Sequence, residues 1–250
     1  MSQLLVADLG TVPYSDALEL QRAAARARIS GELSEDLLIL VEHPPVVTLG
    51  RSSKANHLLA SPGLLASRGV ELHEVERGGD VTFHGPGQLV GYPIVDLKRH
   101  RQDLHWYLRL VEEALIHALV PFGIVGERSA GFTGVWTSGR KLASIGVHAR
   151  DWVTWHGFAL NVTTDLSFFD LIVPCGISEV EMTSVWREIE GRKSGAADTD
   201  SSSSVPNDSS RLGESVRASV VRAFGEVLEL RVVGLDPTEL ERVARSVVPI

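Results

Sequence analysis

The sequence has one cysteine, Cys175, in 250 residues, so no disulfide can form within the chain and a cysteine-rich metal site is excluded. It contains no H-E-x-x-H motif and its nine histidines are scattered, so we expect no bound metal. It also lacks the G-x-S-x-G motif of a hydrolase serine. Cys175 is therefore the candidate nucleophile that remains.

Long apolar runs are missing as well. None approaches the roughly 20 residues that span a bilayer, and the N-terminus lacks the basic-then-apolar pattern of a secretory signal. We therefore expect a cytoplasmic protein that binds no membrane. The formal net charge of −8 argues against general nucleic-acid binding, which depends on clustered lysine and arginine side chains.

The apolar pattern predicts an α+β fold. Helices are expected at residues 13–28, 61–67 and 103–122. Strands are expected at residues 4–9, 36–41, 46–49, 70–75, 89–95, 135–137, 141–149 and 152–162. The strands come in groups with helices between the groups, which indicates a mixed, largely antiparallel sheet with flanking helices.

Residues 194–210 have no aromatic and almost no aliphatic side chain, so they cannot bury enough surface to become ordered. We expect a disordered loop there. It is followed by a C-terminal segment, residues 211–250, with a helix at 211–224, a strand at 227–233 and a helix at 237–246. No linker divides the chain, so residues 1–250 are expected to form one domain.

The most distinctive stretch is residues 77–97, RGGDVTFHGPGQLVGYPIVDL, which holds five glycines and ends in a strand pattern. Glycine allows positive φ and lets a ligand lie close to the backbone. The loop also carries four polar side chains: Arg77, Asp80, Thr82 and His84. This composition indicates one wall of a binding site, and the alternative is a glycine-rich connection with incidental polar residues.

Cys175 follows Pro174 and precedes Gly176, at the end of a strand-like apolar run. This context places the thiol at a rigid loop edge, where neighbouring N–H groups could stabilise an oxyanion. The alternative is that Cys175 is a small buried hydrophobic residue.

Lys141 follows the turn of an expected hairpin. In a regular strand its side chain shares a face with Ala143, Ile145 and Val147, all of them apolar. Desolvation lowers the pKa of a lysine, and a neutral amine can act as a base. The alternative is that Lys141 lies on the turn with its ammonium group in water.

Three blocks in this order resemble the lipoyl(octanoyl) transferases: RGGDVTFHGPGQLVGYPIVDL, GRKLASIGVHAR and GFALNVTTDLSFFDLIVPCGI. The resemblance covers roughly residues 1 to 190. It implies the fold shared by biotin and lipoate protein ligases, in a single catalytic domain. It also implies transfer of an octanoyl group from octanoyl-acyl carrier protein to a specific lysine of lipoyl domains, without a cofactor.

The resemblance assigns roles to individual residues. It implies that Cys175 carries the acyl group as a thioester and that Lys141 lowers the pKa of Cys175. The implied acceptors are the lipoyl domains of 2-oxoacid dehydrogenase complexes and the glycine cleavage H protein. The implied substrate-binding residues are Arg77, Gly78, Gly79, Asp80, Val81, Thr82, Phe83, His84, Ser144, Ile145, Gly146, Gly157, Phe158 and Ala159.

Two other classes of protein fit parts of the same pattern. An ATP-dependent lipoate ligase on the same fold would activate the acid as an adenylate and need no cysteine. A non-enzymatic acyl-binding module would need the pocket but not Cys175. The Pro-Cys-Gly context and Lys141 favour the transferase.

Overall fold

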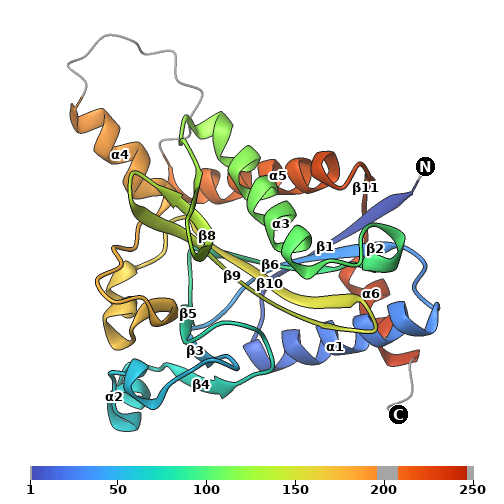
Figure 1. Ribbon diagram of the computed structural model, residues 1–250, viewed down its shortest axis with the longest axis horizontal. Coiled ribbons are helices and arrows are strands. Elements are labelled where there is room, and N and C mark those ends of the chain that lie inside the picture. The colour runs from blue at the N-terminus through green and yellow to red at the C-terminus, as the bar shows by residue number, and fades with distance from the viewer. Residues whose placement is uncertain (1, 196–207, 247–250) are drawn as a thin grey trace.

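The computed structural model describes residues 2–195 and 208–246, which form an α+β fold around an eight-stranded mixed sheet (Figure 1). In spatial order its strands are β11 (Arg231–Gly234), β1 (Gln3–Thr11), β2 (Asp36–Glu42), β6 (Gln88–Ile94), β10 (Val153–Asn161), β9 (Arg140–Arg150), β8 (Phe132–Thr137) and β7 (Glu127–Ser129). The pairs β11–β1 and β1–β2 are parallel, and every other neighbouring pair is antiparallel. The predicted fold class is confirmed.

Helices cover both faces of this sheet (Figure 1). On one face α3 (Leu104–Leu119) lies against α5 (Ser209–Val227), and their apolar sides form the larger hydrophobic core with strand residues such as Leu38 and Leu160. On the other face α1 (Tyr14–Ser30) and α6 (Pro237–Ser246) bury a second core. A sheet buried on both sides is a rigid support for a site built on its strands.

A second, three-stranded sheet lies beside the main one and carries the glycine-rich loop. Its order is β4 (Glu71–Glu74), β3 (Val46–Leu49), β5 (Thr82–His84). The short helix α2 (Pro62–Ser67) packs against it, and the Ser61 hydroxyl caps α2 by accepting a hydrogen bond from the Leu64 N–H at 3.2 Å. The helix predicted at residues 61–67 is confirmed, with the cap that serine before proline favours.

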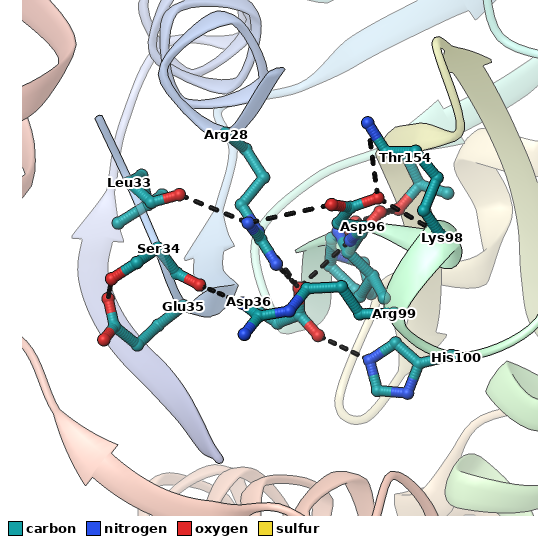
Figure 2. Close-up of polar contacts among 12 residues, drawn as sticks. Arg28, Leu33, Ser34, Glu35, Asp36, Asp96, Lys98, Arg99, His100 and Thr154 are labelled. Atoms are coloured by element: carbon teal, nitrogen blue, oxygen red, sulfur yellow. Dashed lines mark hydrogen bonds and ion pairs between the residues drawn. The ribbon is translucent and has the colours of Figure 1, made fainter. Parts of the chain in front are cut away.

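A buried cluster of charged side chains joins α1 to the start of β2 and to the residues that follow β6 (Figure 2). The guanidinium of Arg28 lies 3.0 Å from Asp36 and 3.8 Å from Asp96, and all three side chains are almost fully buried. His100 Nε2 is 2.6 Å from the other Asp36 oxygen. Burial would raise the pKa of Asp36, but the hydrogen bonds from His100 and the Asp96 N–H and the charge of Arg28 together hold it below its ordinary value.

Several element boundaries differ from the prediction. Helix α3 ends at Leu119, and residues 120–122 form a 3-10 turn, because Pro121 has no N–H to continue the helix. Helix α5 continues to Val227, where a strand was expected, and β11 begins only at Arg231. Helix α4 (Val185–Gly195) and the edge strand β7 were not predicted.

The expected loop at 194–210 is wrong at both ends, because Ser194 and Gly195 belong to α4 and residues 209–210 to α5. Its remaining part, residues 196–207, lies outside the described residues. Among the helices of the described segments, none is both long enough and apolar enough to cross a membrane.

Candidate active site

Cys175 sits at the centre of a tight 3-10 turn, Pro174–Gly176, that faces the glycine-rich loop. Its backbone has φ = +56°, a left-handed conformation that costs a non-glycine residue roughly 1–3 kcal/mol. Two backbone hydrogen bonds hold the turn: Cys175 N–H to Val81 O at 2.9 Å and Val173 N–H to His57 O at 2.8 Å. Cys175 is partly exposed, so it is not a buried core residue.

The turn does not form the expected oxyanion site. The N–H groups of Cys175, Gly176 and Ile177 donate to the carbonyl oxygens of Val81, Val173 and Pro174, at 2.9 to 3.0 Å. The prediction that N–H groups beside the cysteine stabilise an oxyanion is therefore wrong for this conformation. A tight turn satisfies its own backbone donors, which leaves none of these three to bind substrate.

Lys141 is completely buried, so its side chain does not extend from the hairpin turn into water. Its Nζ donates a hydrogen bond to Thr133 O at 3.0 Å and lies 4.8 Å from the centre of the Trp136 ring. A carbonyl oxygen and the face of an aromatic ring are both favourable neighbours for a lysine side-chain nitrogen.

A β-bulge puts Lys141 on a different face of the sheet from the one predicted. Val135 pairs with Ala143 and the next residue, Trp136, pairs with Lys141, so β9 carries one extra residue between them. Consecutive residues of β8 point to opposite faces, and directly paired residues share a face. Lys141 therefore faces away from Ala143 and toward the side of Ser144, whose Oγ is 3.5 Å from Cys175 Sγ.

Arg77 fastens the glycine-rich loop to the three-stranded sheet. Its guanidinium donates to Thr48 O and Asp80 O, both at 2.7 Å, and to Thr48 Oγ1 at 2.8 Å. Burial lowers the pKa of Arg77, and the neighbouring Tyr14 and Cys175 act in the opposite direction. Arg77 thus holds the loop and also places a positive charge near Cys175.

The glycines of the site let backbone segments pack closely. Gly78 N–H donates to Val147 O at 2.8 Å, and a Cβ added to Gly146 would lie 2.7 Å from Gly78 O. A Cβ on Gly157 would lie 2.2 Å from Gly91 O. Gly146 and Gly157 are therefore required for close contact between main chains.

Strand β5 divides the predicted residues between the core and the site. Val81 and Phe83 are fully buried in a hydrophobic cluster with Phe169, whereas Thr82 and His84 line the cavity beside Cys175. The alternation of side chains along an extended strand explains this division. The structure therefore does not support contact between a substrate in this cavity and the side chains of Val81 and Phe83.

The other fourteen predicted residues line one cavity of ≈ 380 Å³, with Cys175 and Lys141 among them. Several further lining residues were missed by the sequence analysis: Tyr14, Val90, Tyr92, Leu104, Leu108, Phe132, Thr133 and His156. They come from five separate elements, α1, β6, α3, β8 and β10, with at most two residues from each, so no local motif could have identified them.

The supporting contacts include a histidine–aspartate hydrogen bond that the sequence did not suggest. His57 Nδ1 lies 2.7 Å from Asp80 Oδ2, and this carboxylate touches the turn after Cys175. In the part of the chain that the structure describes, no group of three or more His, Cys, Asp or Glu side chains could hold a metal ion.

The arrangement of the sheets is that of the lipoate protein ligases. The chain superposes on the bi-partite lipoate protein ligase of Thermoplasma acidophilum with a TM-score of 0.70, over 98% of this chain and 92% of that chain. The sequences are 18% identical, so this likeness concerns the fold alone.

Sequence comparison defines the family. The family model of the lipoyl protein ligase A/B catalytic domain matches residues 13–198, and the chain belongs to this family. Among its curated relatives, the octanoyltransferase of Gloeobacter violaceus is 54% identical over 71% of this chain and 78% of its own length. The octanoyltransferase of a Nostoc species is 45% identical over 92% of this chain and 94% of its own.

Proposed function

We propose that this protein is an octanoyltransferase of protein lipoylation and that it carries the octanoyl group as a thioester on Cys175. The relatives named octanoyltransferase support the activity. The covalent route is supported by one observation above all: Cys175 and the buried Lys141 open into the same cavity. A thiol, an amine and an enclosed space are the components that nucleophilic acyl transfer needs.

In the first half-reaction the Cys175 thiolate attacks the carbonyl carbon of the octanoyl thioester. A new carbon–sulfur bond forms on Cys175, and the bond to the donor sulfur breaks. The donor leaves as a thiolate and takes up a proton to become a thiol. Exchange of one thioester for another has a reaction free energy close to zero, so this step needs no nucleotide.

In the second half-reaction a lysine amine of the acceptor attacks the thioester on Cys175. The amide bond forms, Cys175 leaves as a thiolate, and the attacking lysine nitrogen loses a proton. Formation of an amide from a thioester lowers the free energy and makes the whole transfer favourable. Dividing the reaction in this way lets one acyl cavity serve two protein partners in turn.

Lys141 would transfer protons and stabilise negative charge in both steps. If Lys141 is charged at rest, it stabilises the Cys175 thiolate electrostatically; if it is neutral, it accepts the thiol proton directly. Both routes give the same ammonium–thiolate pair, so the titration belongs to the pair of groups. The Lys141 ammonium gives its proton to the departing donor thiolate, and the neutral amine then accepts the proton from the attacking lysine of the acceptor.

The cavity suits a medium-length acyl chain. Its apolar lining comes from Val90, Leu104, Leu108, Phe132 and Ile145. Each buried CH₂ group contributes about 0.8 kcal/mol, so the chain alone supplies several kcal/mol of binding free energy. We infer that the donor is octanoyl-acyl carrier protein and that the acceptors are lipoyl domains, including those of 2-oxoacid dehydrogenases and the glycine cleavage H protein. The reaction would take place in the cytoplasm.

Nucleotide dependence tests this function directly. Octanoyl-acyl carrier protein and a lipoyl domain, mixed with the enzyme and no nucleotide, should give octanoylated lipoyl domain. A requirement for ATP with free octanoate as the donor would instead identify a ligase, an activity that the same fold supports. Binding of the acyl chain without transfer would identify an acyl-binding module.

A further inference from the structure

Helix α3 carries a fully buried carboxylate that the proposed mechanism does not use. Among the acidic and basic side chains that the structure describes, histidine aside, only Glu112 and Lys141 have a relative exposure of 0%. Leu104, Leu108 and Glu112 are spaced by four residues, so they follow one face of α3. The two leucines line the cavity, and Glu112 lies one turn further along the helix, where α3 packs against β8 (Figure 1).

One peptide group of β8, between Thr133 and Gly134, joins this carboxylate to the lysine. Its N–H, on Gly134, donates to Glu112 Oε1 at 3.0 Å. Its carbonyl oxygen, on Thr133, accepts the hydrogen bond from Lys141 Nζ at 3.0 Å. The carboxylate and the amine therefore bind the two ends of the same peptide group.

Gly134 allows this peptide group to lie so close to the lysine. Its φ is +136°, which only glycine adopts readily. A Cβ at this position would lie 2.5 Å from Ala143 O and 3.0 Å from Lys141 Nζ. The contact of the amine with β8 thus depends on the residue type as well as on the conformation.

Two arginines neutralise the carboxylate without taking the oxygen that binds β8. Arg109 Nη1 and Arg128 Nε donate to Glu112 Oε2 at 2.6 and 3.1 Å. A buried ion pair adds little net stability, because the cost of desolvation offsets the attraction. Stability alone therefore does not explain a carboxylate among the apolar side chains of α3.

The charge of Glu112 has a consequence for the lysine. An ionised acceptor on its N–H polarises a peptide group and makes the carbonyl oxygen of that group a stronger acceptor. A stronger acceptor at Thr133 stabilises the Lys141 ammonium that pairs with the Cys175 thiolate.

We propose that Glu112 is a positioning residue for acyl transfer. Through the Thr133–Gly134 peptide group it orients the Lys141 side chain, stabilises its ammonium form and so increases the reactive thiolate of Cys175. Glu112 itself does not line the cavity. The inference rests on the proposed pairing of Lys141 with Cys175 and extends it to a residue on another element.

Alkylation of Cys175, the only cysteine, by iodoacetamide at pH 7 tests the proposal. Glu112→Gln keeps an oxygen for the Gly134 N–H but removes the charge. It should slow alkylation about threefold, because a neutral oxygen polarises the peptide group less. In a Lys141→Met background the same substitution should leave the rate unchanged, since no amine remains to respond.

Glu112→Asp is a second variant, which serves if Glu112→Gln does not fold. It keeps the charge for both arginines, but its side chain is one carbon too short to reach the Gly134 N–H from the same place. It too should slow alkylation only when Lys141 is present. A purely structural role of Glu112 would lower the free energy of unfolding and leave the alkylation rate of the folded protein unchanged.

Glu188→Gln is the matched control. The Glu188 carboxylate binds the guanidinium of Arg140, the neighbour of Lys141, with two hydrogen bonds of 2.9 Å. Its other hydrogen bond comes from the Thr183 hydroxyl, so it contacts no peptide group that binds the lysine amine. Glu188→Gln should lower stability but alkylate at the rate of the parent.

The variants separate this inference from the function on which it rests. If Lys141→Met alkylates like the parent, the proposed pairing of Lys141 with Cys175 is wrong. If Lys141→Met is slow, two results overturn the inference about Glu112 alone. One is the parent's rate in a folded Glu112→Gln or Glu112→Asp, and the other is equal slowing by these substitutions with and without Lys141.

Discussion

Ser144 Oγ lies 3.5 Å from Cys175 Sγ, and Ser144 shares its face of β9 with Lys141 only because of the bulge at the Val135–Ala143 pair. In a regular strand, residues 141 and 144 would face opposite sides. The bulge therefore brings the lysine to the side of the sheet where the cysteine lies. The proposed pairing of an amine with a thiol depends on this one extra residue.

The first prediction concerns the thiolate of Cys175. A free thiol with a pKa near 8.5 is only a few per cent thiolate at pH 7. Lys141→Met keeps the apolar stem under Trp136 but removes the amine. It should slow iodoacetamide alkylation of Cys175 at pH 7 about tenfold and move the pH profile of alkylation upward.

Lys141→Arg separates the two possible roles of the amine, because arginine keeps the charge but does not give up a proton. Retained alkylation with lost transfer would indicate that Lys141 moves protons. Lys54→Met, at an exposed lysine, is the control and should behave as the parent. If Lys141→Met alkylates and transfers like the parent, Lys141 has no role in either step.

The second prediction concerns the contact between the glycine-rich loop and β9. A Cβ on Gly146 would lie 2.7 Å from Gly78 O and 3.3 Å from Arg77 Cδ. Because neither backbone segment can move freely, Gly146→Ala should lower the free energy of unfolding by about 1–3 kcal/mol. Gly63→Ala, where an added Cβ meets nothing within 4 Å in α2, should change it by less than about 1 kcal/mol. Urea denaturation measures both, and equal stabilities would contradict the predicted clash.

The third prediction concerns the pH dependence of stability. Burial lowers the pKa of His43 to about 4, and burial with the nearby His43 lowers that of His84 to about 3. Between these values and the unfolded value of about 6.5, the unfolded chain binds more protons than the folded one. Stability should therefore rise with pH through this window and fall from pH 7 to pH 5 by roughly 2 kcal/mol per histidine.

His84→Gln tests that assignment, because glutamine keeps a hydrogen-bonding side chain but does not titrate. The loss of unfolding free energy between pH 7 and pH 5 should shrink by roughly 2 kcal/mol in this variant. His105→Gln, at an exposed histidine, should leave the loss unchanged. A pH profile of His84→Gln identical to that of the parent would mean that His84 titrates normally.

Part of this site could be predicted from the sequence because its segments are local. The Pro-Cys-Gly turn, the glycine-rich loop and the hairpin lysine are each visible in a few consecutive residues. The face of Lys141 was predicted wrongly because a bulge leaves no mark in an apolar pattern. Tyr14 and His156 could not be predicted as lining residues, because they reach the cavity only through tertiary packing.

The central claim is the thioester on Cys175, and intact-mass spectrometry tests it most directly. After mixing with octanoyl-acyl carrier protein and no acceptor, the parent should gain the mass of one octanoyl group, and hydroxylamine should remove it. Cys175→Ala should gain no mass and transfer nothing to a lipoyl domain. Octanoyl transfer by Cys175→Ala at the rate of the parent would contradict the covalent mechanism.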